Sequence, residues 1–331
     1  MDSLKQPPVS NERLIVNSTS TRAQAGISAV EASILIPTKN GEQCIRPCLE
    51  AAYSQKGVGP IEVLIIDSGS TDATLEIARC YPVRIENIPS ESFHHARTRN
   101  FAAGLARGEF LVFLSQDAIP VDDSWLAAML GNFRDPAVGA VYGRQLPVSG
   151  APAERQETLA TIYSDERLVK SISTRENLGY RYYHFSNANA AIRKVVWEAT
   201  RFPEDFKVFE DLGIAKHILD SGWKIVYEPR APVYHSHNHA TLGLFKRYFD
   251  IGFTFRRMGI WNSGTRVSLV RDGWKQVQKK ILRFEGNGNN CRTRVSLGQV
   301  LAKAVGMFLG LNEQFLPLVI KRRMSAFRVY E

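Results

Sequence analysis

Cysteine is scarce in this chain, which limits both disulfide chemistry and metal chemistry. The 331 residues contain four cysteines, at Cys44, Cys48, Cys80 and Cys291. Their spacing forms no disulfide framework, and the pair Cys44 and Cys48 has no second pair that would complete a structural zinc site. We therefore expect free thiols and a reducing, cytoplasmic compartment.

Long apolar runs and repeats are absent as well. No stretch of the sequence approaches the roughly 20 apolar residues that a bilayer-spanning helix requires. Residues 1–30 lack the apolar segment of a signal peptide, and no low-complexity tract or internal repeat is evident. We expect these first residues to form a loose arm ahead of one large or two small folded domains.

Short apolar runs alternate with helix-like stretches in the first part of the chain. Strands are predicted at residues 33–36, 62–66, 83–88 and 110–114, and helices at 45–53, from about 73, and at 96–106. Gly108 is expected to end the last of these helices. The alternation is typical of a mostly parallel sheet with helices on both faces. Two of the strands lead into Asp67 and Asp117, so both carboxylates should lie at the same edge of the sheet.

Asp117 allows two interpretations at the end of its strand. Ligands of open α/β sheets bind beyond the carboxyl ends of the strands, where a carboxylate can hold a divalent cation and the cation a diphosphate. The alternative is that Asp117 only caps a turn before Pro120.

Five short motifs follow one another along the chain: PTKN at 37–40, DSGSTD at 67–72, ARTRN at 96–100, SQDA at 115–118 and FED at 209–211. In this order they resemble glycosyltransferase family 2, whose members are inverting enzymes with a GT-A fold that use nucleotide sugars. The resemblance covers residues 33 to about 240. Residues 93–100 and 115–118 are most similar to the bacterial rhamnosyltransferase branch, which uses dTDP-L-rhamnose and builds surface polysaccharide.

The resemblance implies a set of positions that contact the nucleotide sugar. They are Pro37, Thr38, Asp67, Arg99, Asn100, Gln116 and Asp117. Pro37 and Thr38 match the turn that lies against the base, and Asp67 matches the acid that contacts base or ribose. Arg99 and Asn100 match a helix pair near the nucleotide, where a guanidinium can also approach phosphate.

A divalent cation, Mg²⁺ or Mn²⁺, is the cofactor that the resemblance implies. Asp117 matches the last acid of the family's DXD motif, although Ser115 stands where the first acid is usual. A histidine that follows the base completes the expected ligands, with His237 as first choice and His235 as second. Alternation in an extended segment would place both on one face with His239, so a separate three-histidine zinc site is the alternative.

Asp211 matches the catalytic base of the family. A carboxylate in this role takes the proton from the acceptor hydroxyl as its oxygen attacks the anomeric carbon. Glu210, Asn187 and Asn189 are assigned to the acceptor or to the transferred sugar. The residues by themselves also allow plainer roles, because two acids can complement a helix N-terminus and two asparagines can occupy turns.

Positive charge gathers after residue 240 and contributes to a formal net charge of +9. Basic and aromatic residues interleave there, as suits an anionic membrane surface. A solvated helical face is an alternative, and so is nucleic-acid binding, although no nucleic-acid motif is present and we expect no such partner. The apolar stretch 300–311 can dock on the main domain, on a second subunit in a homo-oligomer, or on lipid.

These observations predict an α/β protein in three parts. They are a loose arm at 1–30, a GT-A-like Rossmann-type domain at 31–240 and a basic, mainly helical extension at 241–331. We interpret the chain as an inverting glycosyltransferase that moves L-rhamnose from dTDP-L-rhamnose to a saccharide or lipid-linked saccharide in surface polysaccharide synthesis. A UDP-sugar donor and a non-catalytic sugar-nucleotide-binding protein are the alternatives. We expect a cytoplasmic protein, with peripheral contact to the inner face of the cytoplasmic membrane left open.

Overall fold

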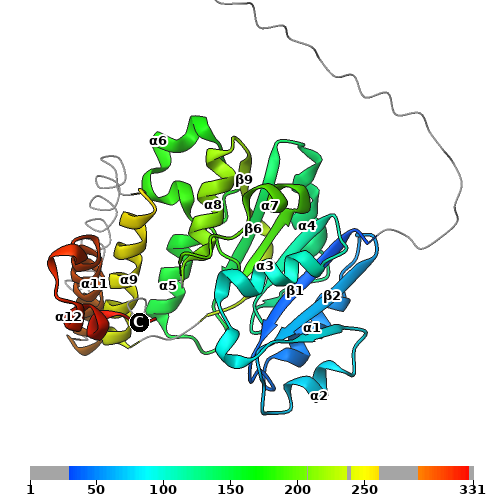
Figure 1. Ribbon diagram of the computed structural model, residues 1–331, viewed down its shortest axis with the longest axis horizontal. Helices are drawn as coiled ribbons and strands as arrows, with labels where there is room; N and C mark the ends of the chain where they lie inside the picture. The colour runs from blue at the N-terminus through cyan, green and yellow to red at the C-terminus, as the bar shows by residue number, and fades with distance from the viewer. Residues whose placement is uncertain (1–29, 207, 237–239, 261–289, 328–331) are drawn as a thin grey trace, which may run out of the picture.

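One mixed β-sheet forms the centre of the molecule (Figure 1). The structure, a computed structural model, describes residues 30–206, 208–236, 240–260 and 290–327. Within these residues the strands follow the order β3-β2-β1-β4-β8-β6-β9-β5, and β7 also pairs with β9. Their bounds are β1 (Ala32–Thr38), β2 (Ile61–Asp67), β3 (Arg84–Asn87), β4 (Phe110–Leu114), β5 (Ile119–Pro120), β6 (Val138–Leu146), β7 (Leu168–Lys170), β8 (Asn189–Arg193) and β9 (Lys224–Tyr234).

Helices connect the strands and continue beyond them. The α-helices are α1 (Ile45–Tyr53), α2 (Thr74–Ala78), α3 (His95–Leu105), α4 (Trp125–Leu130), α5 (Ala153–Ile162), α6 (Arg175–Leu178), α7 (Lys194–Thr200), α8 (Glu210–Asp220), α9 (Thr241–Arg257), α11 (Asn290–Leu311) and α12 (Leu318–Met324). The 3₁₀ helices are η1 (Ser90–Ser92), η2 (Gly131–Arg134), η3 (Ile172–Thr174), η4 (Gly179–Tyr183) and η5 (Glu313–Phe315). The predicted strands and helices of the first part are confirmed to within a few residues.

The directions of the strands bring their carboxyl ends together at one edge of the sheet. β3, β2, β1 and β4 pair in parallel, as predicted. β8 is inserted between β4 and β6 and runs antiparallel to both, so the sheet is mixed. β6 and β9 therefore point the same way as β4, and the carboxyl ends of β1, β2, β4, β6 and β9 meet at one edge. β8 escaped prediction because its five residues, mostly small, form neither a long apolar run nor an alternating pattern.

Helices cover both faces of the sheet. Along β1, Ile34 and Ile36 join the core that α1 and α4 complete, whereas Leu35 joins the core that α3 and α8 complete. Successive side chains of a strand point to opposite faces. The strands read as unbroken apolar runs because both of these faces are buried.

Gly108 has a different role from the expected one. Helix α3 ends at Leu105, and Ala106 closes it with hydrogen bonds to Ala102 and Ala103. Gly108 instead lies against β1, where an added Cβ would stand 2.6 Å from the backbone nitrogen of Ser33. Its own N–H donates to the Ser33 hydroxyl at 2.8 Å. The residue is a glycine because the chain passes close to β1 before β4 begins.

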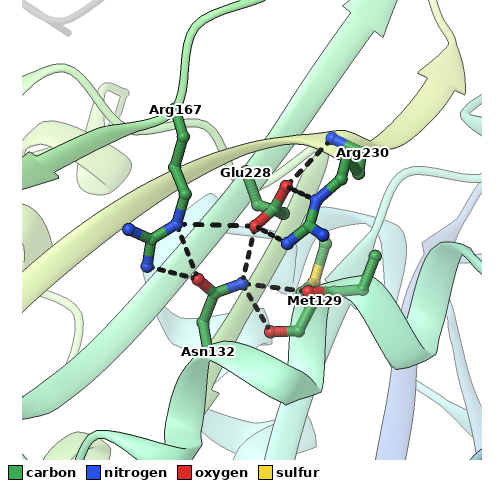
Figure 2. Close-up of polar contacts among 6 residues, drawn as sticks. Met129, Asn132, Arg167, Glu228 and Arg230 are labelled. Atoms are coloured by element: carbon green, nitrogen blue, oxygen red, sulfur yellow. Dashed lines mark hydrogen bonds and ion pairs between the residues drawn. The ribbon is translucent and has the colours of Figure 1, made fainter.

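A buried carboxylate anchors β9 to the helical layer behind it. Figure 2 shows Glu228, which is fully buried, with Arg230 donating to it at 2.9 and 3.1 Å and Asn132 donating at 3.1 Å. The Arg167 Nε lies 3.6 Å from the same carboxylate. Burial alone would raise the pKa of Glu228, but the hydrogen bonds from Arg230 and Asn132 outweigh it and lower that pKa. This anchor fixes the strand that leads to His235.

Helices α9 and α11 pack closely through glycines. Gly252 of α9 lies against the α11 backbone, and Gly306 and Gly310 of α11 lie against the α9 backbone. With α12 they occupy the side of the molecule away from α1 and α2 (Figure 1). Leu311 enters the same core as α8, so the apolar stretch docks on its own chain, while Phe308 stays exposed. Among the described helices, none combines the length and the apolar character needed to cross a bilayer.

This close packing predicts opposite effects for two glycine substitutions in α11. In Gly310→Ala the new Cβ would overlap the carbonyl oxygen of Phe249, which belongs to the α9 backbone and cannot rotate away. We expect the free energy of unfolding to fall by about 1–3 kcal/mol. Gly298→Ala is the control, because nothing lies near that position, and alanine should raise helix stability by up to about 1 kcal/mol. Urea unfolding followed by circular dichroism measures both; equal values would contradict the close approach of the two helices.

Candidate active site

Hydrogen bonds join the carboxyl ends of β1 and β2 at the edge of the sheet where the site lies. The Thr38 hydroxyl donates to Asp67 at 3.2 Å. The other oxygen of Asp67 accepts the N–H groups of Gly69 and Ser70, each at 2.9 Å. Asp67 is almost fully buried, so its carboxylate shapes the loop that follows β2. Contact of Pro37, Thr38 and Asp67 with a nucleotide stays a prediction.

Gln116 joins the loop after β4 to the loop after β1. Its amide oxygen accepts the N–H of Lys39 at 3.0 Å, and its amide nitrogen donates to the Lys39 carbonyl at 3.1 Å. This two-point bond leaves the next residue, Asp117, at the edge of the sheet with 37% of its side chain exposed. Asp117 is thus a carboxylate that remains accessible at the end of a buried strand.

His235 is the imidazole that the structure places beside Asp117. Its Nε2 lies 3.5 Å from the Asp117 carboxylate, and its Nδ1 lies 2.9 Å from the amide oxygen of Gln145. That oxygen can only accept, so Nδ1 carries a proton, and Nε2 is the ring nitrogen that faces Asp117. His237, our first choice, lies outside the described residues. Gln145 belongs to β6, and its amide oxygen orients the histidine.

A carboxylate and an imidazole nitrogen that face each other suit a divalent cation. Within the described residues no cluster of three or more histidine, cysteine, aspartate or glutamate side chains is present. Mg²⁺ often takes only one or two carboxylates from the protein and completes its shell with substrate phosphates and water, and neutral imidazole is the commonest side-chain ligand of metals. The donor set of Asp117 and His235 therefore fits a cation shared with a bound diphosphate.

Asp211 lies at the start of α8 with its pKa raised. Burial raises the pKa of Asp211 to about 7, and the negative charge of Glu210 adds to the effect. The Leu212 N–H and the charges of Arg99 and Arg247 oppose it. Phe209, just before the helix, has a left-handed backbone conformation with φ of 61°, which residues other than glycine rarely adopt. A half-buried carboxylate tuned near neutrality suits a general base.

Glu210 differs from its neighbour because it is paired. The Arg99 guanidinium lies 3.0 Å from its carboxylate, and Asn187 donates to it at 3.2 Å. Burial alone would raise the pKa of Glu210, yet the positive charge of Arg99, followed by that of His95, lowers it. Glu210 is therefore ionised when Asp211 binds its proton. Arg99 is paired with this carboxylate, and its contact with phosphate stays a prediction.

The side chains of Asn100 and Asn189, two predicted ligand contacts, form hydrogen bonds within the fold. The Asn100 amide oxygen accepts the indole N–H of Trp197 at 3.1 Å and the backbone N–H of Phe202. The Asn100 amide nitrogen donates to the backbone carbonyl of Phe202. The Asn189 side chain is fully buried and accepts the indole N–H of Trp125 at 2.9 Å. Both amides are engaged within the fold, and their contact with a ligand stays a prediction. The sequence could not show this, because the partners lie between 64 and 102 residues away.

One chain of contacts links the two halves of the site. His235 reaches Gln145, whose amide nitrogen bonds the Ser186 hydroxyl at 2.8 Å. The next residue, Asn187, bonds Glu210, which adjoins Asp211. The carboxyl end of β4 and the start of α8 are therefore parts of a single site, with the segment before β8 between them.

Helix α9 also reaches the site, which the sequence did not reveal. The Arg247 guanidinium stacks 5.5 Å from the ring centre of Phe209 and 5.8 Å from that of Phe327. Its positive charge acts to lower the pKa of Asp211, against the larger effect of burial. In the sequence Arg247 is one of many basic residues after residue 240. Only the fold shows that it lies against Phe209, next to the start of α8.

Comparison with known proteins agrees with this geometry. The family model described as "Glycosyl transferase family 2" matches residues 33–199. The chain is 34% identical to the O-antigen chain rhamnosyltransferase RfbN of Salmonella typhimurium over 90% of this chain and 95% of the relative. It is 35% identical to the O-antigen chain rhamnosyltransferase WbaN of Salmonella anatum, with the same coverage of both chains.

Solved structures share the fold at lower sequence identity. The mannosyltransferase PcManGT from Pyrobaculum calidifontis, in complex with GDP-Man and Mn²⁺, aligns with a TM-score of 0.59 at 16% identity, covering 86% of this chain and 88% of that one. S. aureus TarS in complex with UDP-GlcNAc aligns with a TM-score of 0.52 at 18% identity, covering 69% and 66%.

The pairing of Arg99 with Glu210 predicts a stability defect for Arg99→Leu. The variant leaves a nearly buried carboxylate without its cation, so the free energy of unfolding should fall by about 3–5 kcal/mol. Since the folded-state pKa of Glu210 is lowered, the pair stabilises the fold above the unfolded-state pKa of about 4.3. The defect should therefore begin to shrink only as the pH falls below about 4.3 toward the lowered folded-state pKa of Glu210. Urea unfolding at pH 7.5 and pH 4 measures it.

Arg97→Leu is the matched control for that experiment. Arg97 lies in the same helix with its side chain exposed, and its loss should change stability by less than about 0.5 kcal/mol. A stable Arg99→Leu protein that binds nucleotide weakly would return Arg99 to the phosphate-binding role.

Proposed function

The chain belongs to glycosyl transferase family 2, and from this premise we propose that it is an inverting rhamnosyltransferase of bacterial surface polysaccharide synthesis. The donor in this proposal is dTDP-L-rhamnose and the acceptor is a saccharide, free or lipid-linked. The observation that carries it is the match, over 90% of the chain, to two proteins named as O-antigen rhamnosyltransferases. Membership of the family makes the protein a glycosyltransferase, and the finer identity of the sugar is our proposal.

Asp211 is the group that we assign to the chemical step. Its carboxylate accepts the proton of an acceptor hydroxyl while the hydroxyl oxygen forms a bond to the anomeric carbon of the donor sugar. The bond between that carbon and the diphosphate oxygen breaks, and the electron pair leaves with the nucleoside diphosphate. Attack from the face opposite the leaving group inverts the anomeric centre. A pKa of about 7 makes Asp211 both ionised and basic near neutral pH.

The neighbouring Glu210 supports this step through its charge. Arg99 and Asn187 keep Glu210 ionised, and its negative charge holds the pKa of Asp211 up. Two adjacent carboxylates thus have different proton affinities because only one of them has a cationic partner. Such separation is how one site assigns different roles to two acids.

The donor would lie across the edge formed by β1, β2 and β4. We assign the nucleoside to the surface around Pro37, Thr38 and Asp67, and the diphosphate to the neighbourhood of Asp117 and His235. Those two residues would hold Mg²⁺ or Mn²⁺, which when bound neutralises charge on the departing diphosphate. The support is their 3.5 Å separation and the orientation of His235 by Gln145.

The outer side of α11 and α12 supports a peripheral position on an anionic membrane. Large apolar side chains are exposed in α11, η5 and α12, namely Leu301, Phe308, Phe315, Leu318 and Val319. The last turn of α12 carries the basic residues Lys321, Arg322 and Arg323, and Lys321 is paired with Glu313. Apolar and basic groups on one surface are what an anionic bilayer attracts. A lipid-linked acceptor would then reach the site from the same side as α9.

A donor screen tests the sugar and the cation together. We expect slow release of dTDP from dTDP-L-rhamnose, and none from UDP-glucose, UDP-N-acetylglucosamine or GDP-mannose. EDTA should abolish the release, and Asp117→Asn should lower it by about 10–100-fold because it removes the carboxylate from the cation. Asp205→Asn changes an exposed carboxylate that is not among the assigned site residues, so it is the control and should release dTDP normally. Release of UDP would instead identify a UDP-sugar enzyme, and binding without any turnover would favour a non-catalytic protein.

Removal of the base predicts loss of turnover with donor binding retained. Asp211→Asn keeps the shape of the side chain but cannot accept the proton, so the transfer rate should fall by about 10²–10⁴-fold. The dissociation constant for dTDP-L-rhamnose should stay within a few-fold of the parent value. Asp205→Asn again serves as the control.

The same assignment determines the pH profile. Below a pH of about 7 Asp211 is protonated and inactive, so kcat/KM should fall tenfold per pH unit on the acid side and level off above it. Glu210→Gln removes the neighbouring negative charge and so lowers the pKa of Asp211. The fall in kcat/KM should then begin at a lower pH. A profile that is flat down to pH 5 would exclude Asp211 as the base.

A further inference from the structure

Three arginines from separate segments line one small hollow of the surface. The hollow has a volume of about 440 Å³, and its lining consists of Ala127, Ala128, Gly131, Asn132, Arg134, Asp135, Arg167 and Arg230. Arg134 belongs to η2, Arg167 precedes β7 and Arg230 belongs to β9. None of these eight residues is among those assigned to the donor, the cation or the acceptor. We call this feature the arginine hollow.

Two of the arginines are held in place from below, as Figure 2 shows. Arg230 donates to the buried Glu228 through Nε at 2.9 Å and Nη2 at 3.1 Å, and Arg167 donates to the Asn132 amide oxygen through Nε at 3.2 Å and Nη2 at 2.7 Å. The Nη1 group of each has no hydrogen-bond partner among the described residues, and 46% of the Arg167 side chain and 75% of the Arg230 side chain are exposed. Both guanidinium groups are therefore fixed while N–H groups of each remain available to a ligand.

Positive charge is in excess around the arginine hollow. Arg134 is exposed and forms no ion pair within the part of the chain that the structure describes. Asp135, the acid of the lining, is already bound to Lys224 at 2.9 Å. Four cations are thus matched by two carboxylates, and the four are Arg134, Arg167, Arg230 and Lys224. A concave surface that carries charge mainly of one sign concentrates its electric field and attracts ions of the opposite sign.

Small residues keep the arginine hollow open. Gly131 lies where α4 passes into η2, and a Cβ added there would have no other atom within 4 Å. Its φ of −56° is ordinary for any residue, so the backbone does not require a glycine at this position. Ala127 and Ala128 add only methyl groups to the lining. The volume lies within the range of roughly 300–1,000 Å³ that is typical of small-molecule sites, so a compact ligand fits.

We propose that the arginine hollow is a second ligand site, separate from the donor edge, which binds a small anion that carries a phosphate or diphosphate group. Guanidinium groups match phosphate oxygens and form charge-assisted hydrogen bonds with them. A phosphate monoester carries roughly 1.5–2 negative charges at pH 7, which balances the excess of two cations. Because Glu228 and Asn132 already hold two of the arginines, binding orders few side chains. The site does not depend on which sugar the donor carries.

Calorimetric titration of the full-length protein with inorganic pyrophosphate tests this site without turnover. EDTA is present, so that no divalent cation assists binding at the donor edge. We expect one bound pyrophosphate, and Arg134→Gln and Arg167→Gln should each weaken it by about 10–100-fold because each removes a charge-assisted partner. Arg134→Lys should retain part of the affinity. Arg79→Gln is the control, since Arg79 is an exposed arginine that follows α2, and it should leave the affinity unchanged.

A steric variant tests the same site with every arginine in place. Gly131→Leu puts a side chain into the open space and should weaken pyrophosphate by at least tenfold, although no charge is lost. Neither Gly131 nor Arg134 contacts Glu228, so these variants leave the buried carboxylate with its partners. Thermal unfolding checks that each variant is folded. If Arg167→Gln fails to fold, Arg134→Gln and Gly131→Leu still decide the outcome.

Other anions and one donor-site variant complete the test. Pyrophosphate that binds at least tenfold tighter than inorganic phosphate indicates a diphosphate ligand, and equal affinities indicate a single phosphate group. Citrate that binds more tightly than pyrophosphate would overturn the assignment to phosphate. Three results would overturn the site itself: no binding of pyrophosphate, an affinity that is the same in Arg134→Gln and Gly131→Leu as in the parent, or loss of binding in Asp117→Asn. The last would place pyrophosphate at the donor edge.

Discussion

The ion pair between Arg99 and Glu210 is the interaction on which the site depends. It joins α3, which packs on the parallel half of the sheet, to the first residue of α8. Both side chains are nearly buried, so the attraction is weakly screened and each charge needs the other. The pair also keeps a negative charge next to Asp211, and that charge, added to burial, keeps the proton affinity of Asp211 near neutral pH. One contact thus holds two elements together and sets the basicity of the neighbouring carboxyl.

The rest of the sheet brings distant loops to the same place. β8 runs against its neighbours, so the segment before it, with Ser186 and Asn187, lies at the edge where β4 and β6 end. The buried Glu228 holds β9 in position through two arginines and Asn132, and the end of β9 carries His235 to Asp117. A fully buried carboxylate would be unfavourable by itself, and it is stable here because four donors surround it.

The C-terminal helices are part of the same structure as the sheet domain. Glycines let α9 and α11 approach closely, and Phe255 of α9 and Leu311 of α11 enter the core that α8 shares. Through Arg247 the helices also reach the base. The basic charge of this region therefore has two locations, one next to Asp211 and one on the outer side of α12.

Much of the framework was determined by the sequence alone, because it depends on local signals. Buried strands read as apolar runs, Asp67 and Asp117 follow two of them, and the order of five motifs identified the family. Asp211 was recognisable as a candidate base by its place in that order. The tertiary structure decided what the sequence left open: Asn100 and Asn189 serve the fold, Arg99 pairs with Glu210, and His235 faces Asp117. These outcomes depend on partners dozens of residues away, and hydrogen bonds of that kind leave no periodic pattern in a sequence.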